Sequence, residues 1–126
     1  MTEENRKLKD SGERETFMTG MVREPNLGRG LYTLISPIAL RKLSIHMENG
    51  AEKYTPRNWE SGGFLSRHLN SAMRHLQDFL EGDREEDHLS ACVFNCFAIT
   101  HVLEMINRDK LPKELNDLPN YVEKEK

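Results

Sequence analysis

The stretch from Arg84 to Asn107 is apolar on nearly every side when it is laid out as a helix. Its apolar residues leave no continuous polar stripe: Leu89, Cys92, Val93, Phe94, Cys96, Phe97, Ile99, Val102, Leu103 and Met105. A helix with so little polar surface is buried on several sides. In a chain of 126 residues, this predicts either the centre of a bundle or part of a subunit interface.

Two more helices are predicted before this segment. Ser36 is a typical N-cap and Pro37 suits the first helical position of the earlier one. Gly50 either ends this helix or is tolerated within it. The second helix runs from about Leu65 to Glu81, with apolar residues at helical spacing: Leu65, Leu69, Ala72, Leu76, Phe79 and Leu80. Gly82 ends it, and Asp83 with Glu86 three residues later resembles a capping box that starts the third helix.

The flanking segments are predicted to be simpler. Residues 1–18 are polar and charged without periodicity, which predicts a mobile N-terminal tail. Residues 19–36 hold several breakers and predict an ordered loop. A single all-α domain is expected over residues 19–110, and residues 111–126 form a C-terminal arm that docks and then frays. No strand pattern of useful length occurs, so the fold class is an all-α bundle of three main helices, completed by oligomerisation.

Composition excludes some function classes. The net charge is −3 and the sequence pI is about 6.0, whereas general nucleic-acid binding needs a basic surplus. The N-terminus has no apolar signal region, and no apolar stretch approaches the ~20 residues of a membrane span. These features predict a cytoplasmic protein. Cys92 and Cys96 are interpreted as buried free thiols, and the absence of HxxxH spacing argues against a zinc site.

Polar side chains at three places are candidates for chemistry. Glu48 and Glu52 lie four apart and can share Mg²⁺, but this spacing is common in helices and a solvated acidic edge beside Lys53 explains it without a metal. Asp87 and His88 enter the apolar helix at its start, where acidic residues are also expected from the helix dipole. Asn95 is harder to explain structurally, because an amide among apolar neighbours must find hydrogen-bond partners.

Two further groups suit a nucleotide. Arg74 and His75 on the second helix can face a phosphate. In the connector between the first two helices, the aromatic residues Tyr54 and Trp59 accompany an amide and two cations: Asn58, Lys53 and Arg57. Aromatic rings can stack a base while the amide reads its edge. The alternative is a tryptophan that plugs the bundle end.

Five short motifs in one order resemble a known phage family over about residues 18–107. They are the strings at residues 19–23, 28–32, 50–54 with 57–59, 71–76 and 86–89, the last followed by Asn95. The family is the dATP/dGTP diphosphohydrolase N-terminal type, related to the MazG-like all-α nucleotide pyrophosphohydrolases. The resemblance implies an enzyme that cleaves a (deoxy)nucleoside triphosphate, with purine deoxynucleotides preferred, into monophosphate and pyrophosphate.

The resemblance also implies site residues, a cofactor and an assembly. Mg²⁺, with Mn²⁺ as a substitute, would be held by Glu48, Glu52, Glu86 and Asp87. Catalytic roles fall to Glu52, Asp87 and His75. The substrate-binding residues would be Arg23, Arg29, Lys53, Tyr54, Arg57, Asn58, Trp59, Arg74, His88 and Asn95. A homodimer or homotetramer in the host cytoplasm is expected.

The sequence departs from the family pattern. The first acidic pair is E-x-x-x-E where E-x-x-E is usual, no E-x-x-D surrounds Asp87, and Asn95 stands where a carboxylate is expected. Two other functions therefore stay open: a nucleotide-binding protein without turnover, and an interaction protein without a nucleotide ligand.

Overall fold

The structure, a computed structural model, describes residues 10–122 of the chain. Contacts divide the chain into two units, residues 1–35 and residues 36–126, and each is described by itself. Residues 1–9 of the predicted tail and residues 123–126 of the predicted arm lie outside the described residues. The domain limits drawn from the sequence stay predictions.

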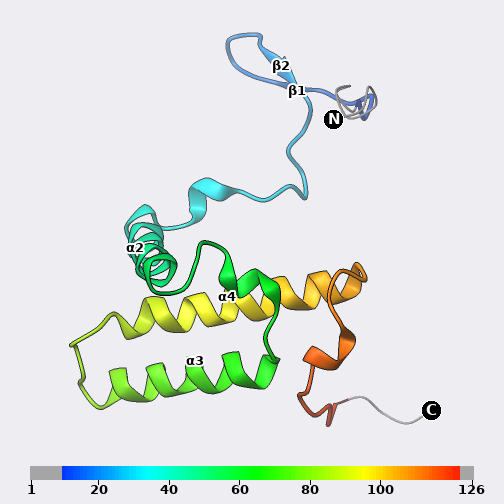
Figure 1. Cartoon of the computed structure of the whole chain (residues 1–126). Coiled ribbons are helices and arrows are strands. Elements are labelled where there is room, and N and C mark those ends of the chain that lie inside the picture. Colours follow the sequence, from blue (N-terminus) through cyan, green and yellow to red (C-terminus); the bar gives the residue numbers. More distant parts are fainter. Residues whose placement is uncertain (1–9, 123–126) are drawn as a thin grey trace. The chain divides into compact units, whose positions relative to one another are not determined.

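The N-terminal unit contains a short antiparallel hairpin (Figure 1). Its strands are β1 (Glu15–Thr16) and β2 (Val22–Arg23). Gly20 closes the turn with a φ of 89° and donates its N–H to the Phe17 carbonyl over 2.8 Å. Glycine adopts such a positive φ at little cost. A 3-10 turn, η1 (Tyr32–Leu34), follows. Strands of two residues carry too little alternation for the sequence to predict them.

The second unit begins with α2 (Pro37–Lys53). The Ser36 hydroxyl oxygen accepts a hydrogen bond from the Ala39 N–H over 3.1 Å, as expected of an N-cap. The helix continues through Gly50, so this glycine is tolerated and does not end it. Leu43 is the one buried residue of α2. This indicates that α2 packs on the rest of the bundle, mainly on α4, through a narrow strip of its surface.

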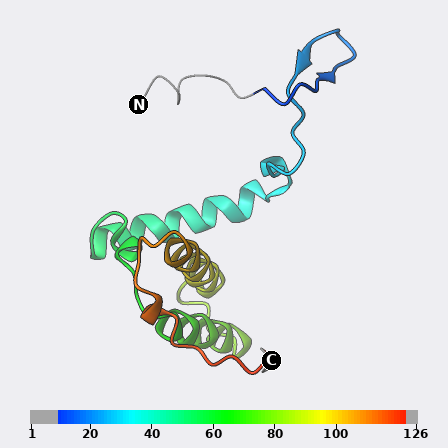
Figure 2. The ribbon, with the colours of Figure 1, turned by 90° about the vertical axis from the view of Figure 1, so that its right-hand side faces the viewer.

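The core of the second unit is an antiparallel pair of helices, α3 (Leu65–Leu80) and α4 (His88–Asn107), which α2 crosses (Figures 1 and 2). Leu65 and Ala72 of α3 are buried, and so are Ala91, Ala98 and Val102 of α4, the helix on which α3 packs. Alanines at these positions let the two helix backbones approach closely. The mostly helical architecture confirms the predicted all-α class.

The predicted start of the third helix was wrong. α4 begins at His88, and Asp87 is its N-cap: the two Asp87 carboxylate oxygens accept from the Ser90 N–H at 3.0 Å and the Ser90 hydroxyl at 2.6 Å. The residues from Asp83 to Glu86 form a loop instead of a first turn. Asp87 thus satisfies two donors of the same residue, as an N-cap does.

α4 has two unlike sides. One packs on α2 and α3, whereas Leu89, Val93 and Phe97 on the other side are 45, 42 and 57% exposed. The predicted burial on several sides is therefore not met within one chain. Among the described helices, α4 alone is long and apolar enough to cross a membrane, a property shared with the core helices of soluble proteins. Cys92 is buried as predicted, whereas the prediction was wrong for Cys96, which is exposed.

The C-terminal segment contacts the start of α3. This segment includes η3 (Lys113–Leu115). Asp117 accepts a hydrogen bond from the Ser66 N–H over 2.9 Å and another from its hydroxyl, so the arm supplies the cap that α3 lacks at its own N-terminus. Leu111 and Leu115 pack against Gly62, at the end of the 3-10 helix η2 (Asn58–Ser61).

Candidate functional site

Two histidines and a carboxylate converge where α3 meets the start of α4. His75 lies on α3, His88 is the first residue of α4, and Glu86 belongs to the loop between them. The two Nδ1 atoms are 2.9 Å apart, and Glu86 Oε1 lies 3.3 Å from each. Among the described residues, these three form the one group of histidine, cysteine or carboxylate side chains close enough to share a metal ion. We call this group the His75–Glu86–His88 cluster.

The cluster is buried at its histidines and open at its carboxylate. His88 is 3% exposed and the His75 side chain 14%, whereas the Glu86 side chain is 61% exposed. Burial lowers the pKa of His75, and the Glu86 carboxylate partly opposes this shift. His75 is therefore mostly neutral at pH 7 and has a lone pair to offer.

His88 has a second polar contact on its other ring nitrogen. Its Nε2 is buried and makes no hydrogen bond, yet it lies 3.4 Å from the Asp83 carboxylate. A hydrogen bond from the Glu85 backbone N–H lowers the pKa of Asp83, and the nearby His88 ring lowers it further. An ionised carboxylate thus stands beside a buried ring nitrogen, which favours a hydrogen atom on that nitrogen.

An open hollow of about 440 Å³ adjoins the cluster. It is lined from α2, the end of α3, the connecting loop and the start of α4 by Lys42, Phe79, Arg84, Glu85, Glu86, Asp87, His88 and Leu89. This volume falls within the range of small-molecule sites. Two of the three cluster residues, Glu86 and His88, also line the hollow, so a ligand there would meet the cluster directly.

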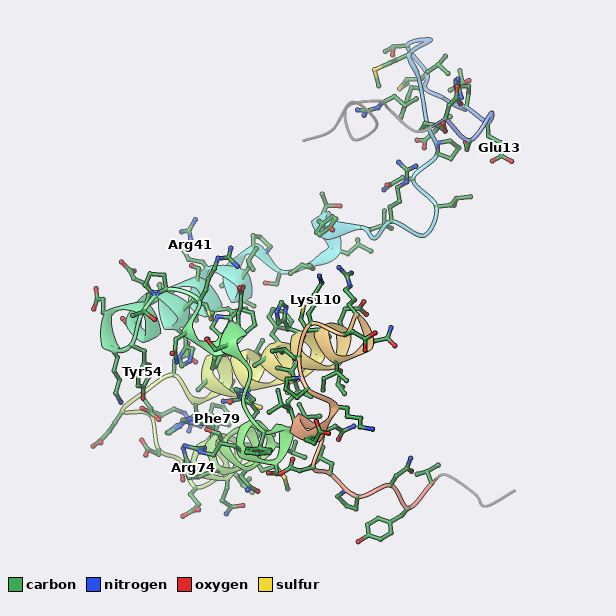
Figure 3. The ribbon with its side chains drawn as sticks, turned by 45° about the vertical axis from the view of Figure 1, so that its right-hand side comes forward. Glu13, Arg41, Tyr54, Arg74, Phe79 and Lys110 are labelled. Atoms are coloured by element: carbon green, nitrogen blue, oxygen red, sulfur yellow. The ribbon has the colours of Figure 1, made fainter. Side chains whose placement is uncertain are left out.

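Arg84 fixes the loop that forms this wall. Its guanidinium lies over the Phe79 ring, 3.9 Å from the centroid, and donates to the Phe79 and Asp83 carbonyl oxygens over 2.9 Å each (Figure 3 labels Phe79). Stacking on an aromatic ring and two hydrogen bonds hold the loop against the end of α3. Arg84 was not among the residues predicted to belong to a site.

The predicted magnesium carboxylates are not gathered in one place. Glu48 and Glu52 are exposed on α2, and neither they nor Asp87 belong to any group of three such side chains within the described residues. Hydrogen bonds from Ser90 lower the pKa of Asp87, aided by the nearby charges of Lys42 and His46. In a single chain, the donor set that is gathered contains two imidazoles and does not fit Mg²⁺, which prefers oxygen ligands.

Asn95 is paired within the bundle. It is 7% exposed, its Nδ2 donates to the Ala91 carbonyl over 2.9 Å, and its Oδ1 lies 3.1 Å from His68 Nδ1. Because the Ala91 oxygen can only accept, the amide oxygen must face His68, so His68 Nδ1 carries the hydrogen. The amide that the sequence marked as unexplained thus finds partners in its own and the neighbouring helix.

The connector aromatics have unequal surroundings. Trp59 packs edge-on against Phe94 and His101, with ring centroids 6.1 and 4.9 Å away, so it covers the bundle. Tyr54 is 61% exposed, with the Lys53 ammonium 5.4 Å from its ring centroid (Figure 3 labels Tyr54). Of the two rings, Tyr54 is the one left free to stack a ligand.

The other arginines and the asparagine of the connector that were predicted to bind substrate are exposed. Arg57, which has a φ of 61°, pairs with Glu60, and Asn58 is exposed at the start of η2. Arg74 contacts the Ser71 hydroxyl at 3.4 Å and otherwise projects into solvent (Figure 3). The other two predicted arginines, Arg23 and Arg29, belong to the N-terminal unit, which is described by itself.

The pairing of His75 with His88 was not predicted from the sequence, and neither was the position of Lys42 in the same hollow. The available signal was position: both histidines lie equally far along the chain from the point between Glu81 and Gly82, just after the end of α3. A spacing rule within one helix does not test that relation.

These features define an all-α protein in which two packed helices and their loop gather imidazoles and a carboxylate beside an open hollow. Residues 20–112 match the family model described as dATP/dGTP diphosphohydrolase, N-terminal, and the chain belongs to this family. The match confirms the resemblance seen in the sequence motifs. No curated protein and no solved structure matches the chain.

Proposed function

We propose that this protein hydrolyses a purine deoxynucleoside triphosphate to the monophosphate and pyrophosphate. The family's description names dATP and dGTP. The observation that carries the proposal is the hollow beside the His75–Glu86–His88 cluster, because Lys42 brings a cation to a wall that also holds groups able to accept a proton.

Three residues that line the hollow would act in this reaction. Phosphoryl transfer needs positioning and neutralisation of charge more than covalent chemistry. Lys42 would hold the phosphate oxygens and stabilise the leaving pyrophosphate. Glu86 and His88, which line both the hollow and the cluster, would orient the water that attacks one phosphorus in line. Outside the hollow, the exposed Tyr54 ring would stack the base, with Asn58 near the edge of the base.

The proposal also covers cofactor, assembly and setting. The activating ion would be Mg²⁺, with Mn²⁺ as a substitute, although the carboxylates expected to hold it do not form one group within the described residues of a single chain. The exposed apolar side of α4 supports a homodimer or homotetramer related to the MazG-like bundles. A role in phage nucleotide metabolism, in the host cytoplasm, comes from the resemblance alone.

The test is turnover with product analysis. Purified protein is incubated with each (d)NTP in Mg²⁺, in Mn²⁺ and in EDTA, and the products are resolved by phosphorus NMR. We expect monophosphate and pyrophosphate from dATP or dGTP. Reaction in ¹⁸O-labelled water then shows which phosphorus is attacked, since the label enters only one product.

A pair of lysine variants links turnover to the hollow. Lys42→Ala removes one charge-assisted contact, commonly worth about 1.5–3 kcal/mol, so kcat/KM should fall roughly ten- to a hundredfold. Lys113→Ala on η3 removes an exposed lysine outside the hollow and should leave turnover unchanged. Equal loss in both variants would contradict the site.

Binding without turnover is the alternative that the structure favours specifically, because the predicted metal carboxylates are not gathered. It predicts a nucleotide-dependent rise in melting temperature that survives EDTA, with no product formed. Absence of both turnover and any melting shift would favour the third function, an interaction protein.

A further inference from the structure

We propose that His75, Glu86 and His88 bind a divalent transition-metal ion of the zinc class, with Asp83 positioning His88 as a ligand. The ligand atoms are the two imidazole Nδ1 atoms and one Glu86 carboxylate oxygen. Two of these ligands, Glu86 and His88, also line the hollow to which hydrolysis is assigned, but binding of an ion by the protein alone can be tested without substrate or turnover.

The distances between the three atoms suit one shared ion. Bonds of about 2.1 Å place two ligand atoms about 3.0 Å apart at a right angle and about 3.4 Å apart at the tetrahedral angle. The observed separations are 2.9 Å between the Nδ1 atoms and 3.3 Å from each to Glu86 Oε1. All three lie close to this interval, so an ion could contact the three atoms at once with ordinary bond lengths.

A direct hydrogen bond between the imidazoles explains less. It would use one hydrogen atom between His75 and His88, and it would leave the Glu86 oxygen equally far from both rings without a clear partner. An ion needs a lone pair on each Nδ1 and therefore places the hydrogen atom of each ring on Nε2.

The other nitrogen of His88 supplies the independent observation. His88 is 3% exposed, and its Nε2 has no hydrogen-bond partner, yet the Asp83 carboxylate lies 3.4 Å away. In metal sites, a carboxylate commonly accepts from the second nitrogen of a ligating histidine, which fixes its tautomer and orientation. The buried nitrogen that lacks a partner and its acidic neighbour are thus both accounted for by metal ligation.

The donor set selects the class of ion. Two imidazoles and one carboxylate favour Zn²⁺, Co²⁺, Ni²⁺ or Fe²⁺ over Mg²⁺, which takes oxygen ligands in an octahedron. Three protein ligands also leave a coordination position open. Glu86 and His88 line the hollow, so this position is accessible to water or to a small anion.

The experiment uses the full chain after removal of any affinity tag. Metal-free protein is titrated with Co²⁺ by absorption spectroscopy and with Zn²⁺ by calorimetry, and bound metal is counted by mass spectrometry after dialysis. We expect one ion per chain, a Co²⁺ spectrum of nitrogen and oxygen ligands, and no displacement by a hundredfold excess of Mg²⁺.

Variants locate the ion. Glu86→Gln changes an exposed ligand and should weaken binding at least tenfold, and His75→Gln should weaken it further. Asp83→Asn should weaken it roughly ten- to a hundredfold if Asp83 orients His88. Glu85 is an exposed carboxylate next to the cluster but outside it. The Glu85→Gln variant should therefore bind the ion as tightly as the unaltered protein does. Circular dichroism of each metal-free variant shows that the helices are retained.

Several results would overturn the proposal. One is that the protein retains less than one ion per chain. Another is that the His75→Gln and Glu86→Gln variants bind the ion as tightly as the unaltered protein does. A third is that Mg²⁺ competes effectively for the site. Intense sulfur-to-cobalt charge-transfer bands would also do so, because they would assign the ion to Cys92 and Cys96.

Discussion

Replacing Asn95 by alanine tests whether this residue supports the bundle or contacts substrate. Its amide makes two hydrogen bonds, to the Ala91 carbonyl and to His68. Each such bond contributes about 0.5–1.5 kcal/mol net, and a buried partner left without one adds to the cost. We therefore expect Asn95→Ala to lower the free energy of unfolding by about 2–3 kcal/mol. In a unit of this size, that lowers the melting temperature by roughly 10 °C or more.

Two companion variants make the reasoning specific. Asn95→Asp keeps the shape and the oxygen facing His68, but it replaces the Nδ2 donor with an oxygen opposite the Ala91 carbonyl. It should destabilise at least as much, because a buried charge loses hydration and faces an acceptor. A double-mutant cycle with His68→Ala should show a coupling energy of about 0.5–1.5 kcal/mol.

The assay is urea and thermal unfolding of the full chain without nucleotide, combined with kinetics of the folded variants. If Asn95→Ala is as stable as the unaltered protein, the hydrogen bonds of Asn95 do not stabilise the bundle and the explanation is wrong. A raised KM in that stable variant would place Asn95 at the substrate. Loss of stability with an unchanged KM for the folded fraction would support its role in the bundle.

Three further predictions concern the arm and the exposed side of α4. Gly62→Ala should lower the free energy of unfolding by roughly 1–3 kcal/mol, because Gly62 has a φ of 97° and a Cβ there would lie 2.9 Å from a leucine of the arm. Gly50→Ala is the control: nothing lies within 4 Å of a Cβ at this position, so the substitution should stabilise α2. Hydrogen bonds from Ser66 hold the pKa of Asp117 below its ordinary value of 3.8. The cap therefore stabilises the arm above pH 3.8, and this stabilisation is lost as the pH falls through the lower pKa of the folded protein. Hydrogen exchange of the arm should show this pH dependence, and Asp117→Asn should abolish it. Phe97→Glu should shift an oligomer to monomer in analytical ultracentrifugation with helix content retained, and an unchanged mass would remove α4 as the contact.

Local signals in the sequence predicted much of the fold. Ser36 and Pro37 marked the start of α2, because capping and a fixed φ act within a few residues. The choice between Asp83 and Asp87 as the cap of α4 depended on something less local. The loop from Asp83 to Glu86 is held by Arg84 stacking on Phe79, a contact between two elements that no capping pattern contains.

The candidate site shows the same distinction. Glu48 and Glu52 were singled out because carboxylates four apart share a helix face, but that rule does not say which way the face points. In the structure both are exposed on α2, whereas the gathered donors come from two helices and a loop. A rule for metal ligands within one helix, such as HxxxH, tests neither orientation nor contacts between helices.

The register of the α3–α4 hairpin supplies the missing relation. His75 and His88 lie equally far from the midpoint between Glu81 and Gly82, and so do His68 and Asn95, the other polar pair that makes a hydrogen bond. The two pairs are seven residues apart on each helix, or about two turns, so they repeat on the facing sides. Because Gly82 was already predicted to end the second helix, folding the sequence about that turn would have paired the polar residues correctly. The position of a turn, combined with helical periodicity, is therefore what would predict both the cluster and the burial of Asn95.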